Sequence, residues 1–365
     1  DRFMISTLFP VIAKDLSLDY RDIGTITGSL AIAWGISALF MGSLSDRIGR
    51  RKVLVGALIA FSVLIGASGL ATGLISLVFV RALMGFADGA YVPASIAETM
   101  EASPPQRSGR NVGLGLAPLL IPPLLHVVDW RWIFVLIAIP GFICAWLTYK
   151  ILPARPTRPS SGTMVWADWL AVTGYGNIRI CMALMLAWLT CLTTISAFLP
   201  NYMLDHLGLT FSQMGTVMSA IGFGSATGTV ILPWMSDRLG RKTIMLAGTA
   251  IIFVALVLLA ASGPAVPHLF ICLFFVMFGT LALITLTVGP LCAESVPPKM
   301  MATASGVVIA TGELFGGGLA PILAGTVAQH WGIDHVLWLP IGVIACAFLL
   351  CTQIQPSKMP AVAHV

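Results

Sequence analysis

Long apolar runs, separated by short polar or charged stretches, fill almost the whole chain. Each run of about 20 residues is long enough to cross the hydrocarbon core of a bilayer as a helix. The short alternating segments of an outer-membrane barrel are absent. The pattern therefore predicts an all-α membrane protein with twelve spans, near residues 1–13, 22–43, 53–73, 74–99, 109–127, 131–151, 179–203, 212–235, 243–262, 265–292, 302–327 and 333–353.

The second half of the chain repeats the first. Asp15 aligns with Asp205 at an offset of 190 residues, and Asp46 aligns with Asp237 at an offset of 191. Between Glu101 and Gly115 the offset rises from 193 to 203, which implies that the first half lacks about ten residues in the span 109–127. The same register places about a dozen residues of the first helix ahead of Asp1. We expect the first span to be truncated and the fifth to be incomplete.

The repeat predicts two six-helix bundles related by a pseudo-two-fold axis. We place the first bundle at residues 1–152 and the second at 179–365, with a cytoplasmic linker at 153–178. The linker is rich in proline, arginine and serine at its start, a composition that buries no core and predicts mobility. Such a duplicated architecture is typical of transporters that rock around a central site.

Composition supports a membrane protein and argues against other classes. The chain is 58% hydrophobic with a mean hydropathy of +0.94, whereas soluble proteins are roughly 45–50% apolar. Fifteen Lys and Arg residues fall on one side of the predicted spans, against Lys14, Arg21 and Arg131 on the other. This asymmetry, and not nucleic-acid binding, explains the net charge of +5 and places both termini in the cytoplasm of an inner-membrane protein. The seven cysteines form no CxxC pair and the histidines form no paired motif, so we expect no metal or cofactor.

A charged cluster separates the second and third spans and recurs in the second half. The first copy includes Gly42, Asp46, Arg47, Gly49, Arg50 and Arg51, and the second includes Asp237, Arg238 and Arg241. A positive-inside anchor explains the basic residues alone, but it does not require Asp-Arg-x-Gly-Arg twice at half-chain spacing. The cluster resembles the motif between helices 2 and 3 of the major facilitator superfamily, and the second copy its equivalent between helices 8 and 9. The resemblance covers essentially the whole chain and implies a monomeric twelve-helix secondary transporter, not an enzyme, with these residues in gating.

Ionisable residues inside the predicted spans are costly and therefore functional candidates. They are Asp1, Arg2, Arg81, Asp88 and Glu313. Arg81 and Asp88 are seven residues apart, so they share one helix face two turns apart. We expect Arg81 to contact substrate and Asp88 to carry a proton, and the alternative is a permanent Arg81–carboxylate brace between helices.

The stretch from Asp1-Arg2 through Pro10 to Lys14-Asp15-Leu16 is similar to the first helix of the anion:cation symporter branch, which includes sugar-acid and organic-anion transporters. The resemblance implies that Arg2 binds an anionic substrate and that Asp1 takes part in proton coupling. The alternative is that this pair lies at a frayed terminus in water.

Glu313 departs from that branch, which has an amide-type residue at about this position. An ionised Glu313 repels an anion or recognises a cation, a protonated one donates a hydrogen bond, and a neutral one simply packs. We also include Tyr91, Trp188, Asn201 and Tyr202 in the predicted substrate site, with packing or interfacial anchoring as the alternative for the aromatic residues.

The function predicted from these residues is proton-coupled symport of a small organic anion, with substrate, protons and lipid as partners. One alternative is a proton-coupled exporter of drugs or metabolites. The other is a membrane protein that transports nothing, although no nucleophile–base pair supports an enzyme and no P-loop supports ATP binding.

Overall fold

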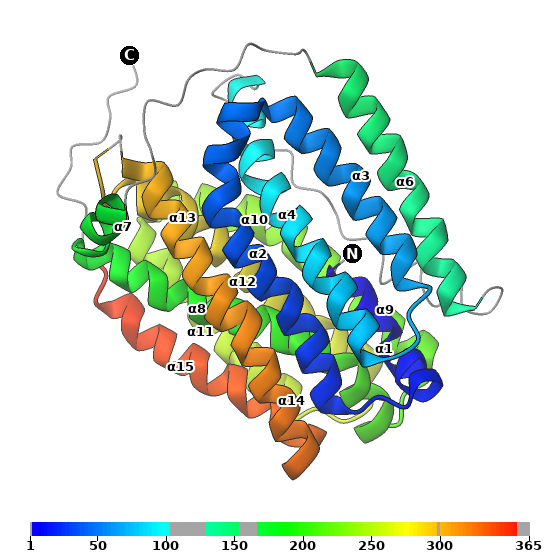
Figure 1. The fold of residues 1–365 in the computed structure, drawn as a ribbon. Helices are drawn as coiled ribbons and strands as arrows, with labels where there is room; N and C mark the ends of the chain where they lie inside the picture. The colour runs from blue at the N-terminus through cyan, green and yellow to red at the C-terminus, as the bar shows by residue number, and fades with distance from the viewer. Residues whose placement is uncertain (1, 103–128, 153–165, 298–299, 356–365) are drawn as a thin grey trace.

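The structure is a computed structural model that describes residues 2–102, 129–152, 166–297 and 300–355. For 2–4, 42–48, 50, 92–102, 166–168 and 301–302 it describes the backbone alone. The first half contains α1 (Arg2–Leu16), α2 (Tyr20–Ile48), α3 (Arg50–Ser68), α4 (Leu74–Ala102) and α6 (Trp130–Ile151) (Figure 1).

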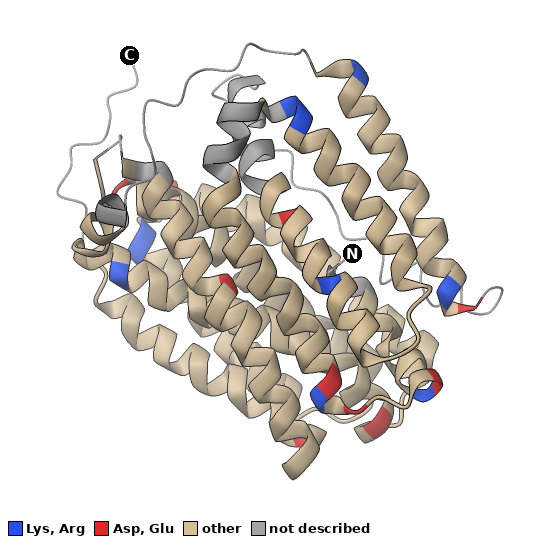
Figure 2. Ribbon diagram, viewed as in Figure 1, with Lys and Arg blue, Asp and Glu red and all other residues tan. Residues whose placement is uncertain are grey.

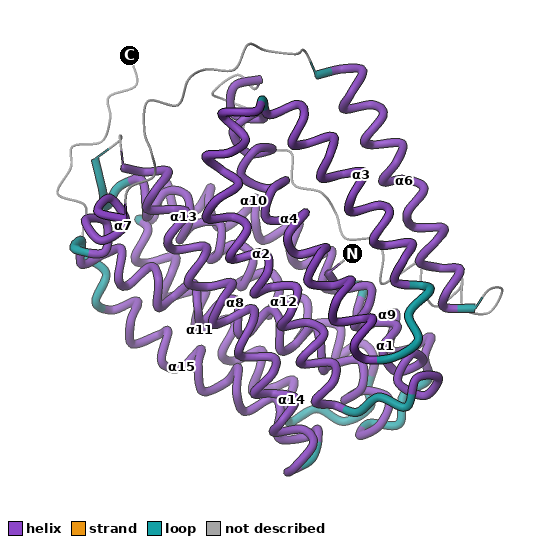
Figure 3. The backbone as a smooth tube through the Cα atoms, viewed as in Figure 1, coloured by secondary structure: helices purple, strands orange, loops and turns teal. Residues whose placement is uncertain are grey.

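The second half begins with the short helix α7 (Trp166–Thr173) and then α8 (Gly176–Asn201), which the π-helical turn η1 (Tyr202–His206) continues. The remaining elements are α9 (Phe211–Met218), α10 (Ala220–Leu239), α11 (Arg241–Ala260), α12 (Val266–Leu286), the π-helical η2 (Thr287–Leu291), α13 (Met301–Thr311), the π-helical η4 (Gly312–Leu319), α14 (Ala320–Trp331), the 3-10 turn η5 (Ile333–Leu337) and α15 (Trp338–Thr352). Figure 3 shows the described chain as helices joined by short loops, with no strand among them.

The predicted spans agree with the helices. In the described part of the chain, ten helical stretches are long and apolar enough to cross a membrane, and each overlaps a predicted span. The 15-residue α1 covers the first predicted span, while the fifth, 109–127, lies outside the described residues. The predicted linker 153–178 is not irregular throughout, because the apolar run Trp166–Thr173 forms α7 and α8 begins at Gly176.

The two halves pack alike. In the first half, α4 packs against α2 and α3, and α3 packs against α6. In the second half, α12 packs against α10 and α11, and α11 packs against α15. Gly49 and Gly240, which precede α3 and α11, have φ angles of 97° and 87°, a conformation that glycine adopts without strain. The repeat in sequence is therefore a repeat in structure.

The bundle has two ends, which we name by their contents. The motif end carries the Gly49 and Gly240 turns, and the distal end carries the loops after α1, α3, η1 and α14. Charged positions gather at these ends, and few lie along the middle of the helices (Figure 2). Apolar side chains such as Ile75, Leu70 and Leu323 are exposed on the outside, as a surface that contacts lipid requires.

Candidate functional site

Helix α4 carries a buried charge pair in mid-span. Arg81 is 1% exposed and is among the largest fully buried side chains, and Asp88 is half-buried two turns further along. The Asp88 carboxylate attracts the Arg81 guanidinium electrostatically. A charge buried at this depth is costly, which makes the pair a candidate site.

Helix α2 lies directly on this part of α4. A Cβ atom built on Gly85 would lie 2.0 Å from the Leu30 carbonyl oxygen, and one built on Gly89 would lie 2.6 Å from the Trp34 carbonyl oxygen. Glycines at these positions let the two backbones touch. This close contact lies one turn after Arg81, on the helix face that α2 covers.

A second face of α2 contacts the other half of the protein. A Cβ atom on Gly24 would lie 2.2 Å from the Pro321 carbonyl oxygen, and one on Gly28 would lie 2.5 Å from the Gly318 carbonyl oxygen. We call this contact of α2 with η4 and α14 the inter-half seam. Gly325 of α14 extends it to the distal end, where its Cβ would lie 2.7 Å from the carbonyl oxygen of the first residue of α2.

Glu313 lies within the inter-half seam. Its side chain is 3% exposed, and a Cβ atom on Gly35 of α2 would lie 3.3 Å from the Glu313 Cβ. On the other side of η4, a Cβ atom on Gly316 would lie 2.4 Å from the Leu186 carbonyl oxygen of α8. The Thr193 hydroxyl donates to the Gly316 carbonyl at 3.1 Å, which satisfies a group whose helical bonding the π-helical turn alters. Glu313 is thus a carboxyl group buried between the two halves.

Two aromatic residues of the predicted site each pack within their own half of the protein. Trp188 is fully buried in α8, and its indole N–H donates to the Thr287 hydroxyl of η2 at 3.2 Å. Tyr91 packs against the cluster of α3 and α4 that includes Val53 and Ala90. Both residues thus make the contacts of the packing alternative, and contact of either one with a substrate stays a prediction.

Asn201 and Tyr202 lie at the distal end of α8. Both are buried, and Tyr202 stacks on His206 with ring centroids 5.0 Å apart. The Asn201 amide donates to Asp205 at 3.5 Å. These two residues therefore belong to the distal end and not to the mid-span level of Arg81.

For several predicted site residues, the structure describes only the backbone or does not include the residue. Asp1 lies outside the described residues, and the backbone alone is described for Arg2, Gly42, Asp46, Arg47 and Arg50. Arg2 begins α1, a helix that packs against α8 of the other half. The predicted meeting of Arg2 with Arg81 and Asp88 stays a prediction.

The second copy of the motif braces two helices. Arg241 forms ion pairs with Asp237 at the end of α10 and, at 3.1 Å, with Glu294 after η2. Arg238 lies over the Trp234 ring, 4.3 Å from its centroid. The described contacts thus join the motif to the end of the helix that follows α11, within one half.

The first copy makes the equivalent contact to the last helix of its half. The Arg51 guanidinium donates to the Tyr149 carbonyl of α6 and lies 4.4 Å from the Tyr149 ring centroid. Lys242, which aligns with Arg51, donates to the Thr352 carbonyl of α15. A basic residue after each motif glycine therefore caps the carboxyl end of the last helix of its half, where the helix dipole favours a cation.

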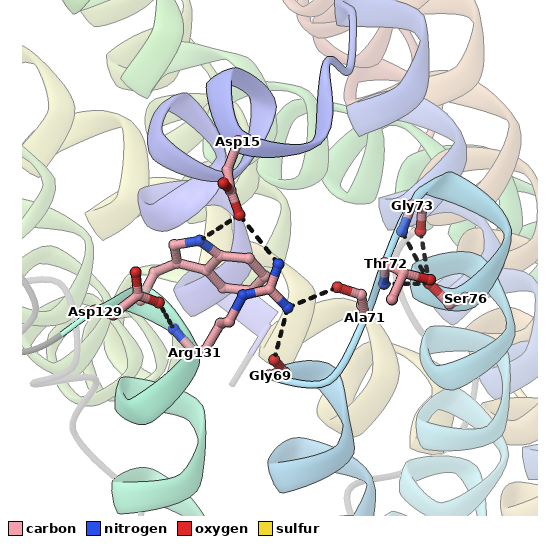
Figure 4. A network of polar contacts seen from close by, with 9 residues as sticks. Asp15, Gly69, Ala71, Thr72, Gly73, Ser76, Asp129 and Arg131 are labelled. Carbon is pink, nitrogen blue, oxygen red and sulfur yellow. Dashed lines mark hydrogen bonds and ion pairs between the residues drawn. The ribbon is translucent and has the colours of Figure 1, made fainter.

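A polar network closes the distal end of the first half (Figure 4). The Arg131 guanidinium pairs with Asp15 at 3.1 Å and donates to the carbonyl oxygens of Gly69 and Ala71 at 3.2 and 2.9 Å. The Trp130 indole N–H also donates to Asp15, at 3.2 Å. One arginine thus joins α1, the loop after α3 and the start of α6.

A different contact marks the distal end between the halves. The Tyr20 hydroxyl, at the start of α2, donates to the Asp205 carboxylate of η1 at 2.9 Å. Neither residue was among the predicted site residues. The alignment of Asp205 with Asp15 was the available signal, but it could not show that the two acids take different partners.

The described residues include no cluster of three or more His, Cys, Asp or Glu side chains that could hold a metal ion. The described cysteines are all free thiols, five of them buried.

Comparisons with known proteins agree with this fold. The family model described as Major Facilitator Superfamily matches residues 1–314 and, in a second match, residues 180–363. The sialic acid transporter NanX of Escherichia coli is 28% identical, over 98% of this chain and 91% of that protein. The gentisate transporter of Corynebacterium glutamicum is 25% identical, over 100% of this chain and 86% of that protein.

A solved structure shares the fold. The crystal structure of a bacterial homologue of the human lysosomal transporter Spinster matches with a TM-score of 0.76 at 15% identity. The match covers 99% of this chain and 95% of that chain. The two-half arrangement described above is therefore that of a known group of membrane transporters.

Proposed function

Because the chain belongs to the major facilitator superfamily and spans the membrane several times, we propose that it is a secondary transporter of a small organic anion, coupled to protons. The observation that carries the proposal is the buried Arg81 with Asp88 on the same face of α4. The two transporters compared above are named for sialic acid and gentisate, which are both small carboxylic acids. A carboxylate or sugar acid is accordingly the proposed substrate.

The proposed mechanism uses competition for one guanidinium. While Asp88 is ionised, its carboxylate attracts the Arg81 guanidinium. Protonation of Asp88 removes that attraction, so Arg81 can bind a substrate carboxylate, and the substrate and the proton are then bound together. By the resemblance to the anion:cation symporters, Arg2 and Asp1 take part in the same way. The halves then rock about the site, with the inter-half seam closed in one state and open in the other.

The basic residues of the motif loops support an orientation with the motif end in the cytoplasm of an inner-membrane protein. In that orientation the seam closes the outer side of the passage. The contacts of Arg241 and Arg51 support a role for the motifs in holding the inner ends of the helices. We propose that the monomer is the transporting unit.

A second candidate function is proton-coupled export of a drug or metabolite. Glu313 favours it, because a carboxyl group buried in the seam at mid-span suits a cationic substrate better than an anion. The direction of flux separates the two functions. A symporter concentrates substrate on the alkaline side, toward which protons flow, and an antiporter concentrates it on the acidic side.

The test uses purified protein in proteoliposomes with an imposed pH gradient. A thermal-shift screen of carboxylates, sugar acids and cationic drugs first supplies the ligand, since a ligand that binds the folded state raises the melting temperature. We expect the wild type to accumulate a carboxylate with the proton gradient, and Asp88→Asn to lose accumulation while it retains exchange. Asp334→Asn, an acid at the distal end, is the matched control and should accumulate normally. Accumulation by Asp88→Asn against a gradient would refute the coupling role.

A further inference from the structure

The distal ends of the two halves are not equivalent, although the repeat aligns them. In the first half, Asp15 is held by Arg131 and by the Trp130 indole. At the offset of 203 that applies to α6 and α15, the position of Arg131 is occupied by Asp334 and that of Trp130 by Ile333. The second half therefore offers its own aspartate no cation at that position.

Asp205, the counterpart of Asp15, bonds across the halves instead. It accepts the hydroxyl of Tyr20 at 2.9 Å. The counterpart of Tyr20, at the offset of 191, is Phe211, which has no hydroxyl. The symmetry-related bond, from residue 211 of the second half to Asp15, therefore cannot form. Asp205 thus keeps a longer hydrogen bond from Asn201 in its own half, at 3.5 Å, and adds a partner in the other half.

The position of this bond relates it to closure. Tyr20 is the first residue of α2, and its carbonyl oxygen lies 2.7 Å from where a Cβ atom on Gly325 of α14 would stand. The bond thus lies at the distal end of the inter-half seam and joins α2 to η1, so it breaks when the second half, with α14 and η1 together, moves away from α2. The backbone contacts along the seam supply packing, and this bond supplies the directional contact.

We propose that Tyr20 and Asp205 form a one-sided latch that holds the distal end closed. This inference rests on transport by alternating access, but not on proton coupling or on the charge of the substrate. Breaking one hydrogen bond of ordinary net strength should raise the fraction of molecules with the seam open by roughly 2- to 10-fold.

The experiment measures opening of the seam directly. The parent protein has its seven native cysteines replaced by alanine and a single reporter, Ile322→Cys, because Ile322 lies against Gly24 and Gly28 in the seam. The rate of maleimide labelling in detergent then follows the open fraction. We expect Tyr20→Phe and Asp205→Ala each to raise this rate by roughly 2- to 10-fold, and the double variant to raise it no further than either single variant.

Two controls make the result decisive. Asp15→Ala, which breaks the corresponding contact inside the first half, should leave the labelling rate at the parent value. Gel filtration confirms that every variant is folded and monodisperse before labelling. The latch is refuted if either single variant labels at the parent rate, if the two effects add, or if Asp15→Ala gives the same increase. The assay contains neither substrate nor pH gradient, so failure of proton-coupled symport leaves its outcome unaffected.

Discussion

A methyl group added at Gly24 should wedge the inter-half seam apart. The Cβ atom would stand 2.2 Å from the Pro321 carbonyl oxygen and 2.9 Å from its carbonyl carbon, whereas ordinary contacts begin at 3.4 Å. Both clashing atoms are backbone, so no side-chain rotation relieves them, and the helices must separate by about 1 Å. Overpacking of this kind costs about 1–3 kcal/mol. Only the closed state bears that cost, so the closed-to-open ratio should fall by roughly 5- to 150-fold.

The assay is a distance distribution between spin labels on the two halves. Leu70 in the first half and Trp331 in the second are 79% and 66% exposed at the distal end, so labels at these positions disturb little packing. In the cysteine-free background, Gly24→Ala should move weight from the short distances of the closed state to longer ones. Initial uptake by proteoliposomes should fall in parallel, because each cycle must pass through the closed state.

The matched control is Gly56→Ala on α3. Gly56 is also a helical glycine, but a Cβ atom there would meet nothing within 4 Å. This variant should leave the distances unchanged and, since alanine favours a helix over glycine, should unfold no more easily than the wild type. If Gly24→Ala and Gly56→Ala give the same distance distribution, the steric reasoning about the seam is wrong.

Two further predictions concern the polar ends. Arg131→Lys should lower the melting temperature, because a single ammonium group cannot hold both Asp15 and the Gly69 carbonyl. The free energy of unfolding should fall by roughly 1–2 kcal/mol. A melting temperature equal to that of the wild type would contradict the stabilising role of the Arg131 contacts. Arg241→Gln should change the free energy of unfolding by no more than about 1 kcal/mol, because its partner Glu294 is 41% exposed, yet it should slow transport several-fold. Unchanged transport would mean that the motif only orients the protein.

Much of the fold could be predicted from the sequence, because the lipid core favours long apolar helices and makes buried charges and unpaired backbone groups costly. That constraint predicts the spans, and the internal repeat predicts which span of the first half is equivalent to which span of the second. It also singled out Arg81, Asp88 and Glu313, since a charge at mid-span is conspicuous in any apolar run. All three are described as buried or half-buried, and none was recognisable from soluble-protein motifs.

Other features depend on contacts that the sequence does not encode locally. The place of Trp188 in the substrate site stays a prediction, because an aromatic residue in an apolar helix looks the same in the sequence whether it faces a passage or packs, and only the structure shows its bond to Thr287. The π-helical turns give no periodic signal, because each adds one residue to a turn within an unbroken apolar run. The bond of Tyr20 to Asp205 could not be predicted, because the repeat alignment pairs residues by position and does not show which partner each residue contacts.

The glycines of α2 have a consequence for the speed of the transport cycle. Where Gly24 and Gly28 meet Pro321 and Gly318, main-chain atoms come into direct contact, and the Ile322 side chain lies beside them. Because a large part of this contact is between backbones, few side chains have to change rotamer when the surfaces part and rejoin, and the activation barrier for this motion contains little side-chain friction. The protein can therefore hold its two bundles tightly together at rest and still exchange conformations quickly.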